Sequence, residues 1–284
     1  MSISSLTKIL GIETGRKEKS VTQSESALGQ NSVAPINEYT VYSAPGLPDW
    51  FPPLMLSATT LGNLSTSPET LRDVIEVLNK LEPDDILVHL QGYFARSISQ
   101  YGEAWRFADI LTVLTAATKL VKPKRYLEIG VRRGRSMAMV ASHQTDCEIY
   151  GFDRWTPNYA GMPNPGPELV QAEVKKLGHS GKLEFISGNS HETVPKFFAE
   201  NPELFFDIIT VDGDHSKDGA ARDLLDVMPH ISVGGLLVFD DICHPKHLYL
   251  SDVWNDVVAS NPKFTAWEYK DLGFGVAFAI RNSK

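Results

Sequence analysis

Short apolar runs alternate with amphipathic segments from Lys124 to the end of the chain. The runs are rich in Val, Ile, Leu and Phe, which is typical of buried strands. The segments between them carry apolar residues at helical spacing. This alternation predicts parallel βαβ units, and therefore a doubly wound α/β sheet of seven strands with helices on both faces.

The apolar pattern predicts the bounds of individual elements. The strands are expected at 126–129, 147–152, 183–187, 206–211, 235–239, 264–269 and 276–280. The helices are expected at 67–81, 105–121, 135–142, 168–177, 191–199, 217–229 and 250–260. The last two strands are joined through a short turn at 272–273, which predicts a closing hairpin with one strand antiparallel to an otherwise parallel sheet.

The N-terminal third reads differently from the rest. Residues 1–45 are rich in Ser, Gln, Glu, Asn and Gly, and we expect a flexible tail there. Residues 46–100 are expected to form an accessory helical segment, because Ser67 and Pro68 provide a capping residue and a first-turn proline. Residues 101–284 are expected to form the domain that carries the sheet.

Composition narrows the range of partners. The chain has 27 Lys and Arg against 35 Asp and Glu, a formal charge of -8, which argues against nucleic acid and favours a small-molecule partner.

No run approaches the roughly 18 apolar residues of a membrane span. Cys147 and Cys243 lack metal-ligand spacing, so we expect reduced thiols and a cytoplasmic protein. A homo-oligomer is compatible with the sequence.

A glycine motif follows the first predicted strand and leads into a helix. It reads Glu128-x-Gly130-x-x-x-Gly134, with Arg132 inside it and Ser136 directly after it. Glycine lets a ligand approach the backbone, and the free N–H groups of a helix N-terminus favour an anion. Asp153 ends the second strand, where doubly wound folds contact a ribose. A nicotinamide-dependent dehydrogenase is disfavoured, because its G-x-G-x-x-G fingerprint is missing.

Ionisable residues gather where the fourth and fifth strands end. Asp212, Asp214 and His215 follow the fourth strand, and Asp240 and Asp241 follow the fifth. Carboxylates brought together repel one another, and a divalent cation such as Mg²⁺, Mn²⁺ or Ca²⁺ would relieve that repulsion. The alternative is that Asp212 contacts only cofactor or substrate while Asp240 or Asp241 caps a turn.

These motifs resemble those of class I S-adenosylmethionine-dependent methyltransferases. The resemblance implies that Gly130 faces the methionine portion of the cofactor, that Asp153 binds the ribose, and that Asn189 and Ser190 meet the adenine edge, although both are also good helix caps. The cofactor-binding residues expected on this basis are Glu128, Gly130, Arg132, Gly134, Ser136, Asp153, Asn189, Ser190 and Asp212.

Over about 125–245 the chain resembles the metal-dependent, macrocin-type sugar O-methyltransferases. This resemblance implies that Asp212, Asp240 and Asp241 bind Mg²⁺ and that Asp214 or His215 is the general base. We prefer His215, because an imidazole titrates near neutral pH. The expected function is methylation of a hydroxyl on a sugar or other natural product. The alternatives are a metal-independent O- or N-methyltransferase that uses His215, and a nucleotide-binding module without activity.

Two further segments border the predicted site. Residues 154–167 are rich in Pro and Gly, and Trp155, Tyr159 and Met162 within them are expected either to form a lid or simply to pack down as a surface loop. His244 and His247 follow the paired acids and are expected to line the acceptor pocket, to extend the metal site, or to be ordinary loop residues.

Overall fold

The structure, a computed structural model, describes residues 54–283. The predicted flexible tail, residues 1–45, lies outside the described residues. Two cysteines, Cys147 and Cys243, are free thiols, as predicted. In the described part of the chain, every helix is too short or too polar to cross a membrane.

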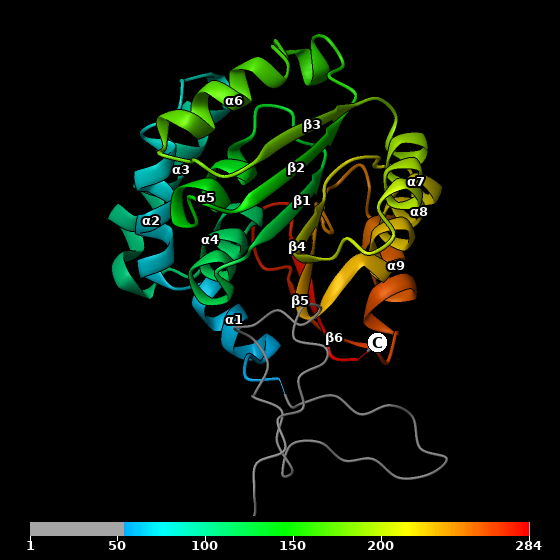
Figure 1. Cartoon of the computed structure of the whole chain (residues 1–284). Coiled ribbons are helices and arrows are strands. Elements are labelled where there is room, and N and C mark those ends of the chain that lie inside the picture. The colour runs from blue at the N-terminus through cyan, green and yellow to red at the C-terminus, as the bar shows by residue number, and fades with distance from the viewer. Residues whose placement is uncertain (1–53, 284) are drawn as a thin grey trace, which may run out of the picture.

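One sheet of seven strands organises the described residues, in the order β3-β2-β1-β4-β5-β7-β6 (Figure 1). Strands β1 to β5 pair in parallel, and β7 is antiparallel to both of its neighbours, β5 and β6. The predicted doubly wound sheet and its closing hairpin are therefore confirmed. The strands are β1 Arg125–Ile129, β2 Glu148–Asp153, β3 Leu183–Ser187, β4 Phe206–Val211, β5 Ile231–Asp240, β6 Phe264–Tyr269 and β7 Val276–Arg281.

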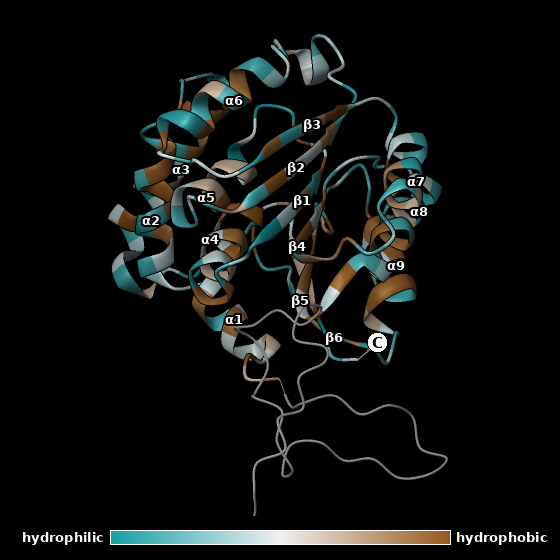
Figure 2. Ribbon diagram, viewed as in Figure 1, coloured by the Kyte–Doolittle hydropathy of each residue, from teal (hydrophilic) through white to brown (hydrophobic). Residues whose placement is uncertain are grey.

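Helices cover both faces of this sheet. In Figure 1, α1 to α6 lie on one side and α7 to α9 on the other. Hydrophobic and hydrophilic stretches alternate along the helices, as expected where one side of each is buried (Figure 2). The helices are α1 Ala58–Ser65, α2 Pro68–Leu78, α3 Asp85–Tyr101, α4 Ile110–Val121, α5 Arg135–His143, α6 Pro167–Lys176, α7 Ser190–Glu200, α8 Lys217–Val227 and α9 Tyr249–Trp254. Short turns of 3-10 helix occur at Gly102–Ala104, Tyr159–Gly161 and Met228–His230.

The sheet separates two hydrophobic cores. Ile208 of β4 packs into the core under α4 and α5, whereas its neighbour Ile209 packs into the core under α7 and α8. Leu236 and Leu237 of β5 divide in the same way. Because both faces of the central strands are buried, their sequences are continuously apolar rather than alternating.

The N-terminal helices belong to the first of these cores. Helix α1 packs on β6, and a Cβ added to Gly62 would lie 2.2 Å from the Trp267 ring. Helices α1 and α3 were not predicted from the sequence. α1 is short, and α3 buries only Leu87 and Phe94 completely, so neither gives a strong apolar rhythm.

Several predicted bounds differ from the structure, among them the end of the helix predicted at 67–81, which is α2 and ends at Leu78. Helix α4 begins at Ile110 instead of residue 105, because the Asp109 carboxylate accepts from Thr112 N at 2.9 Å and the Thr112 hydroxyl accepts from Asp109 N at 3.1 Å. Strand β5 begins at Ile231, before the predicted 235–239, and α8 ends at Val227. After α9 the chain continues as a π-helix, Asn255–Ala259.

Candidate active site

The loop between β1 and α5 has glycine where no other residue fits. Gly130 has φ 92°, and a Cβ on it would lie 1.8 Å from the carbonyl oxygen of Asp212. Gly134 has φ 70°, and a Cβ there would lie 2.5 Å from Val170. The loop therefore runs directly against the end of β4 on one side and against α6 on the other.

Asp153 fixes this loop through its carboxylate. One oxygen accepts from Arg132 N at 2.7 Å and the other from Trp155 N at 2.5 Å. Arg132 has φ 51°, and its guanidinium carbon lies 5.3 Å from the centre of the Tyr159 ring. The Nη2 atom of Arg132 is buried and has no hydrogen-bond partner in the described structure. The structure thus brings Arg132 and Asp153, two predicted cofactor residues, together beside Gly130 and leaves one donor of Arg132 without a partner.

Glu128 lies beneath the loop rather than at its surface. Its side chain is fully buried, and it accepts hydrogen bonds from the hydroxyls of Ser136 and Tyr126. Burial raises the pKa of Glu128 to about 8, against the effect of these hydrogen bonds. In this arrangement Glu128 and Ser136 connect the end of β1 to the first turn of α5.

Asn189 and Ser190 follow β3, beside the end of β2. The Asn189 side chain caps α7 by accepting from His191 N at 3.4 Å, and the Ser190 side chain hydrogen-bonds to Asp223. The backbone N–H of Gly188 donates to the Asp153 carbonyl at 2.9 Å, which places this turn next to the predicted ribose-binding acid. The predicted contact with adenine stays a prediction.

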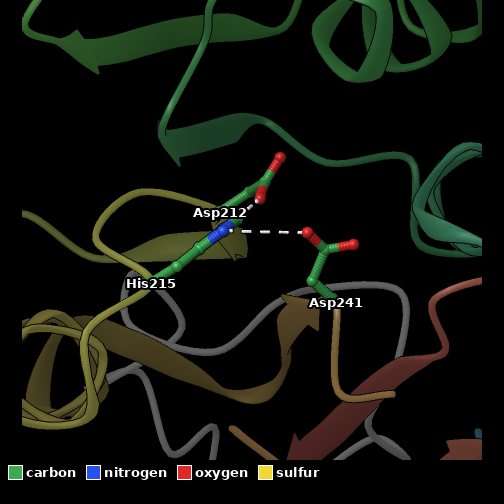
Figure 3. A group of neighbouring side chains, drawn as sticks. All are labelled: Asp212, His215 and Asp241. Atoms are coloured by element: carbon green, nitrogen blue, oxygen red, sulfur yellow. Dashed lines mark hydrogen bonds and ion pairs between the residues drawn. The ribbon is translucent and has the colours of Figure 1, made fainter. Parts of the chain in front are cut away.

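Asp212, His215 and Asp241 converge where β4 and β5 end (Figure 3). His215 Nε2 lies 3.1 Å from Asp212 Oδ1, and its Nδ1 lies 3.8 Å from Asp241 Oδ2. One potential ligand atom from each residue lies within 4.8 Å of the other two. The side chains are 31%, 21% and 16% exposed, in that order, so the group is partly shielded from water but reachable.

The acids of this group perturb one another. Burial, reinforced by the charge of Asp212, raises the pKa of Asp241 to about 7. Burial, together with the charges of Asp241, Asp212 and Asp109, raises the pKa of Asp240 well above its ordinary value. The hydrogen bond to Asp212 raises the pKa of His215 although burial opposes it. Asp240 lies outside the close group of three, and its predicted role as a metal ligand stays a prediction.

Asp214 faces another part of the molecule. Its carboxylate accepts from Ser216 N at 2.8 Å, and its other oxygen lies 3.7 Å from His191 Nε2 at the start of α7. The backbone hydrogen bond from Ser216 and the nearby histidines lower its pKa, although burial opposes them. Of the two candidate bases, the structure therefore brings His215 into the acidic group and turns Asp214 toward α7 and α8.

A row of rings leads from His215 toward the surface. The ring centres of His215 and His247 are 5.5 Å apart, those of His247 and His244 are 4.9 Å apart, and those of His244 and Phe274 are 4.4 Å apart. Phe274 is 53% exposed. Tyr249 stabilises this row by donating to the His215 carbonyl at 2.7 Å and contacting His247 Nδ1 at 2.9 Å.

Phe274 and Tyr249 were missed at the level of sequence. Tyr249 begins a helix, and Phe274 lies between two glycines in a turn, so neither stands in a motif. The proximity of the β6–β7 connection to the acids at the end of β5 arises only when β7 pairs with β5.

The loop between β2 and α6 borders the same region. Tyr159, at the tip of this loop, is 46% exposed. The burial of the rest of its side chain and the charge of Asp212 raise the pKa of Tyr159. Trp155 packs edge-on against Phe185, with ring centres 5.8 Å apart. Trp155 thus anchors the loop and Tyr159 lies near the acids, while the predicted lid movement stays a prediction.

Comparisons with known proteins agree with this arrangement. Residues 127–242 match a family model described as a methyltransferase domain. The matched stretch, which runs from β1 to just past β5, is therefore similar to a methyltransferase domain. No curated protein matches the chain.

Solved structures resemble the fold. One is cofactor-bound Rv0187 from MTB, with 16% identity and a TM-score of 0.51, covering 76% of this chain and 91% of that one. Another is the O-methyltransferase TomG from Streptomyces achromogenes, involved in tomaymycin synthesis, in complex with SAM, with 16% identity and a TM-score of 0.50, covering 81% and 100%. The predicted fold of class I methyltransferases is confirmed.

Proposed function

We propose that this protein is an S-adenosylmethionine-dependent O-methyltransferase that methylates a hydroxyl of a small molecule, a sugar or another natural product, with the help of a divalent cation such as Mg²⁺. The observation that carries the proposal is the close group of Asp212, His215 and Asp241 at the ends of β4 and β5. It adjoins the glycine loop, because Gly130 touches the backbone of Asp212. A base and a charged site thus lie beside a loop suited to the cofactor, as in the macrocin-type enzymes that the sequence resembles.

The loop residues fit S-adenosylmethionine. Gly130 leaves the backbone open to close approach, and the unpartnered Nη2 of Arg132 would satisfy its hydrogen bond on the carboxylate of the methionine portion. Asp153 ends β2 and already accepts from two backbone N–H groups, which orients its carboxylate at the edge where a ribose binds in doubly wound folds. When bound, the cofactor supplies an electrophilic methyl group.

Asp212 and Asp241 fit a divalent cation. Their charges repel each other across the His215 ring, and the raised pKa of Asp241 shows that burial and Asp212 disfavour its ionised form. A hard cation prefers carboxylate oxygens, and when bound it would lower the pKa of an acceptor hydroxyl beside it.

His215 is the proposed base. It would accept the proton of the acceptor hydroxyl as the oxygen bonds to the methyl carbon and the carbon–sulfur bond breaks, which leaves S-adenosylhomocysteine and a methyl ether. Asp212 holds the imidazole at 3.1 Å and stabilises its protonated form after the transfer. The ring row from His247 to Phe274 would contact the acceptor on the open side.

A second candidate is a methyltransferase that needs no metal. It is favoured by the hydrogen bond between His215 Nε2 and Asp212, because a histidine oriented by a carboxylate can act as a base by itself. Metal dependence separates the two candidates.

Calorimetric titration of S-adenosylhomocysteine into the protein, with and without Mg²⁺, tests the proposal. We expect micromolar binding by the wild type and its loss in Asp153→Ala. Tyr101→Ala, at an exposed position on α3, is the control and should bind as the wild type does. Absence of binding by the wild type would reject the methyltransferase proposal. The alternative hypothesis, a nucleotide-binding module without activity, would then have to be considered again. Cofactor binding and turnover that change neither when Mg²⁺ is added nor when a chelator is added would favour the metal-independent enzyme.

A further inference from the structure

A largely buried ion-pair cluster joins the N-terminal helices to the glycine loop. The Asp84 carboxylate lies 2.8 Å from Arg133 Nε and 2.5 Å from Arg135 Nη2. The three side chains are 15%, 10% and 13% exposed, so this pairing is much better shielded than an ordinary surface salt bridge. Arg133 belongs to the glycine loop, and Arg135 is the first residue of α5.

Asp84 is itself held rigidly. It is the N-cap of α3, where one carboxylate oxygen accepts from Ile86 N at 2.9 Å and from Leu87 N at 3.0 Å. Just before it, the backbone N–H of Glu82 donates to the carboxylate of Glu173, a mostly buried residue of α6, at 2.6 Å. The connection between α2 and α3 is therefore fixed to both the glycine loop and α6.

The cationic side chains need this carboxylate. Burial and the neighbouring Arg132 and Arg133 lower the pKa of Arg135, and the charge of Asp84 opposes that effect. Arg133 also reaches the carbonyl of Pro163, in the loop between β2 and α6, at 3.5 Å. Without Asp84, three arginine side chains would crowd one turn with no carboxylate between Arg133 and Arg135, and mutual repulsion would spread the loop.

We propose that Asp84 is a positioning residue for cofactor binding: through Arg133 and Arg135 it holds the 130–134 loop in the conformation that receives S-adenosylmethionine. The N-terminal segment thereby contributes to a site whose contacting residues all lie in the methyltransferase domain. The inference rests on the proposed cofactor role of that loop. Asp84 acts through the two arginines and does not touch the cofactor itself.

Asp84→Asn is the decisive variant. Asparagine caps helices about as well as aspartate, so α3 keeps its cap while the two arginines lose their counter-charge. We expect the dissociation constant of S-adenosylhomocysteine to rise about tenfold, as measured by calorimetry. Asp84→Glu keeps the charge and should recover part of that loss. The matched control is Arg72→Gln, which breaks an exposed N-terminal ion pair with Glu103 and should leave the dissociation constant within twofold of the wild type.

Hydrogen–deuterium exchange without cofactor gives a readout that does not depend on the proposed function. In Asp84→Asn we expect faster exchange in residues 131–137 and unchanged exchange in α8. Unchanged exchange in 131–137, or a dissociation constant within twofold of the wild type, would overturn the positioning role. If instead the wild type binds no cofactor analogue, the proposed function fails, and faster loop exchange would then still support Asp84 as the residue that holds the loop.

Discussion

Gly130 and Asp212 are in backbone contact: a Cβ on Gly130 would lie 1.8 Å from the Asp212 carbonyl oxygen. The two residues directly follow the neighbouring strands β1 and β4, and Asp212 N donates to the Ile129 carbonyl at 2.8 Å, so the contact is fixed by the sheet. The proposed cofactor loop and the proposed metal and base residues therefore share one rigid edge. A substitution that displaces either residue should therefore affect both cofactor binding and metal binding.

The first prediction concerns Gly130→Ala. We expect a loss of more than about 4 kcal/mol of unfolding free energy, or no folded protein, because the added Cβ collides with backbone that cannot move aside. Gly178→Ala is a closely matched control. Gly178 has the same φ of 92° but nothing within 4 Å of the added Cβ, so its cost should be only the roughly 1–2 kcal/mol of a left-handed alanine. Urea denaturation measures both, and equal costs would contradict the close approach.

The second prediction concerns metal binding. Asp241→Asn should weaken Mn²⁺ binding by on the order of a hundredfold, because loss of a ligand costs at least as much as loss of an outer partner, about 10–100-fold. Asp214→Asn removes a carboxylate from the same region that points toward Ser216 and His191, and it should change Mn²⁺ affinity less than about twofold. Electron paramagnetic resonance of free Mn²⁺ gives both affinities. Equal losses in the two variants would show that binding is diffuse attraction to acidic charge.

The third prediction separates two roles of His215. If His215 is the base, the variant His215→Gln should have a kcat lowered by about 10²–10⁴-fold. Its affinities for S-adenosylhomocysteine and Mn²⁺ should be nearly unchanged. If His215 is instead a metal ligand, the same variant should lose about as much Mn²⁺ affinity as Asp241→Asn does. Methyl transfer to an acceptor found by screening, measured beside Mn²⁺ titration, decides between them. A variant with undiminished kcat would exclude His215 from the chemistry.

Much of the sheet could be predicted because its strands are buried on both faces. Ile208 and Ile209 enter opposite cores, and such strands give unbroken apolar runs that sequence alone reveals. The same reasoning placed acids at the ends of β4 and β5. It failed for α3, whose exposed and half-buried positions blur its period, and for the start of α4, because the capping function of Asp109 was not recognised.

The finer geometry of the site depends on contacts between distant segments. No spacing along the chain indicates that His215 turns toward Asp241 while Asp214 turns toward His191. Phe274 does not belong to any sequence motif either, and it contacts His244 only because β7 pairs with β5. Asp84 lay in a segment without recognisable chemistry, and only the folded chain reveals its contacts with Arg133 and Arg135.

The fourth prediction concerns Glu128 and the pH dependence of stability. Burial raises the pKa of Glu128 to about 8 from an ordinary value of 4.5, so the folded protein holds a proton that the unfolded chain releases. This contribution to stability is fully present below pH 4.5 and is lost as the pH rises toward 8, by at most about 1.4 kcal/mol per pH unit.

Glu128→Gln removes this titration and keeps groups able to hydrogen-bond to Tyr126 and Ser136. Between pH 5 and 8 the unfolding free energy of the variant should therefore fall less steeply than that of the wild type, so that the two differ in slope more than in their values at low pH. Urea denaturation at a series of pH values measures this difference. Parallel curves would mean that Glu128 is already ionised in the folded protein, its charge stabilised by groups around the glycine loop.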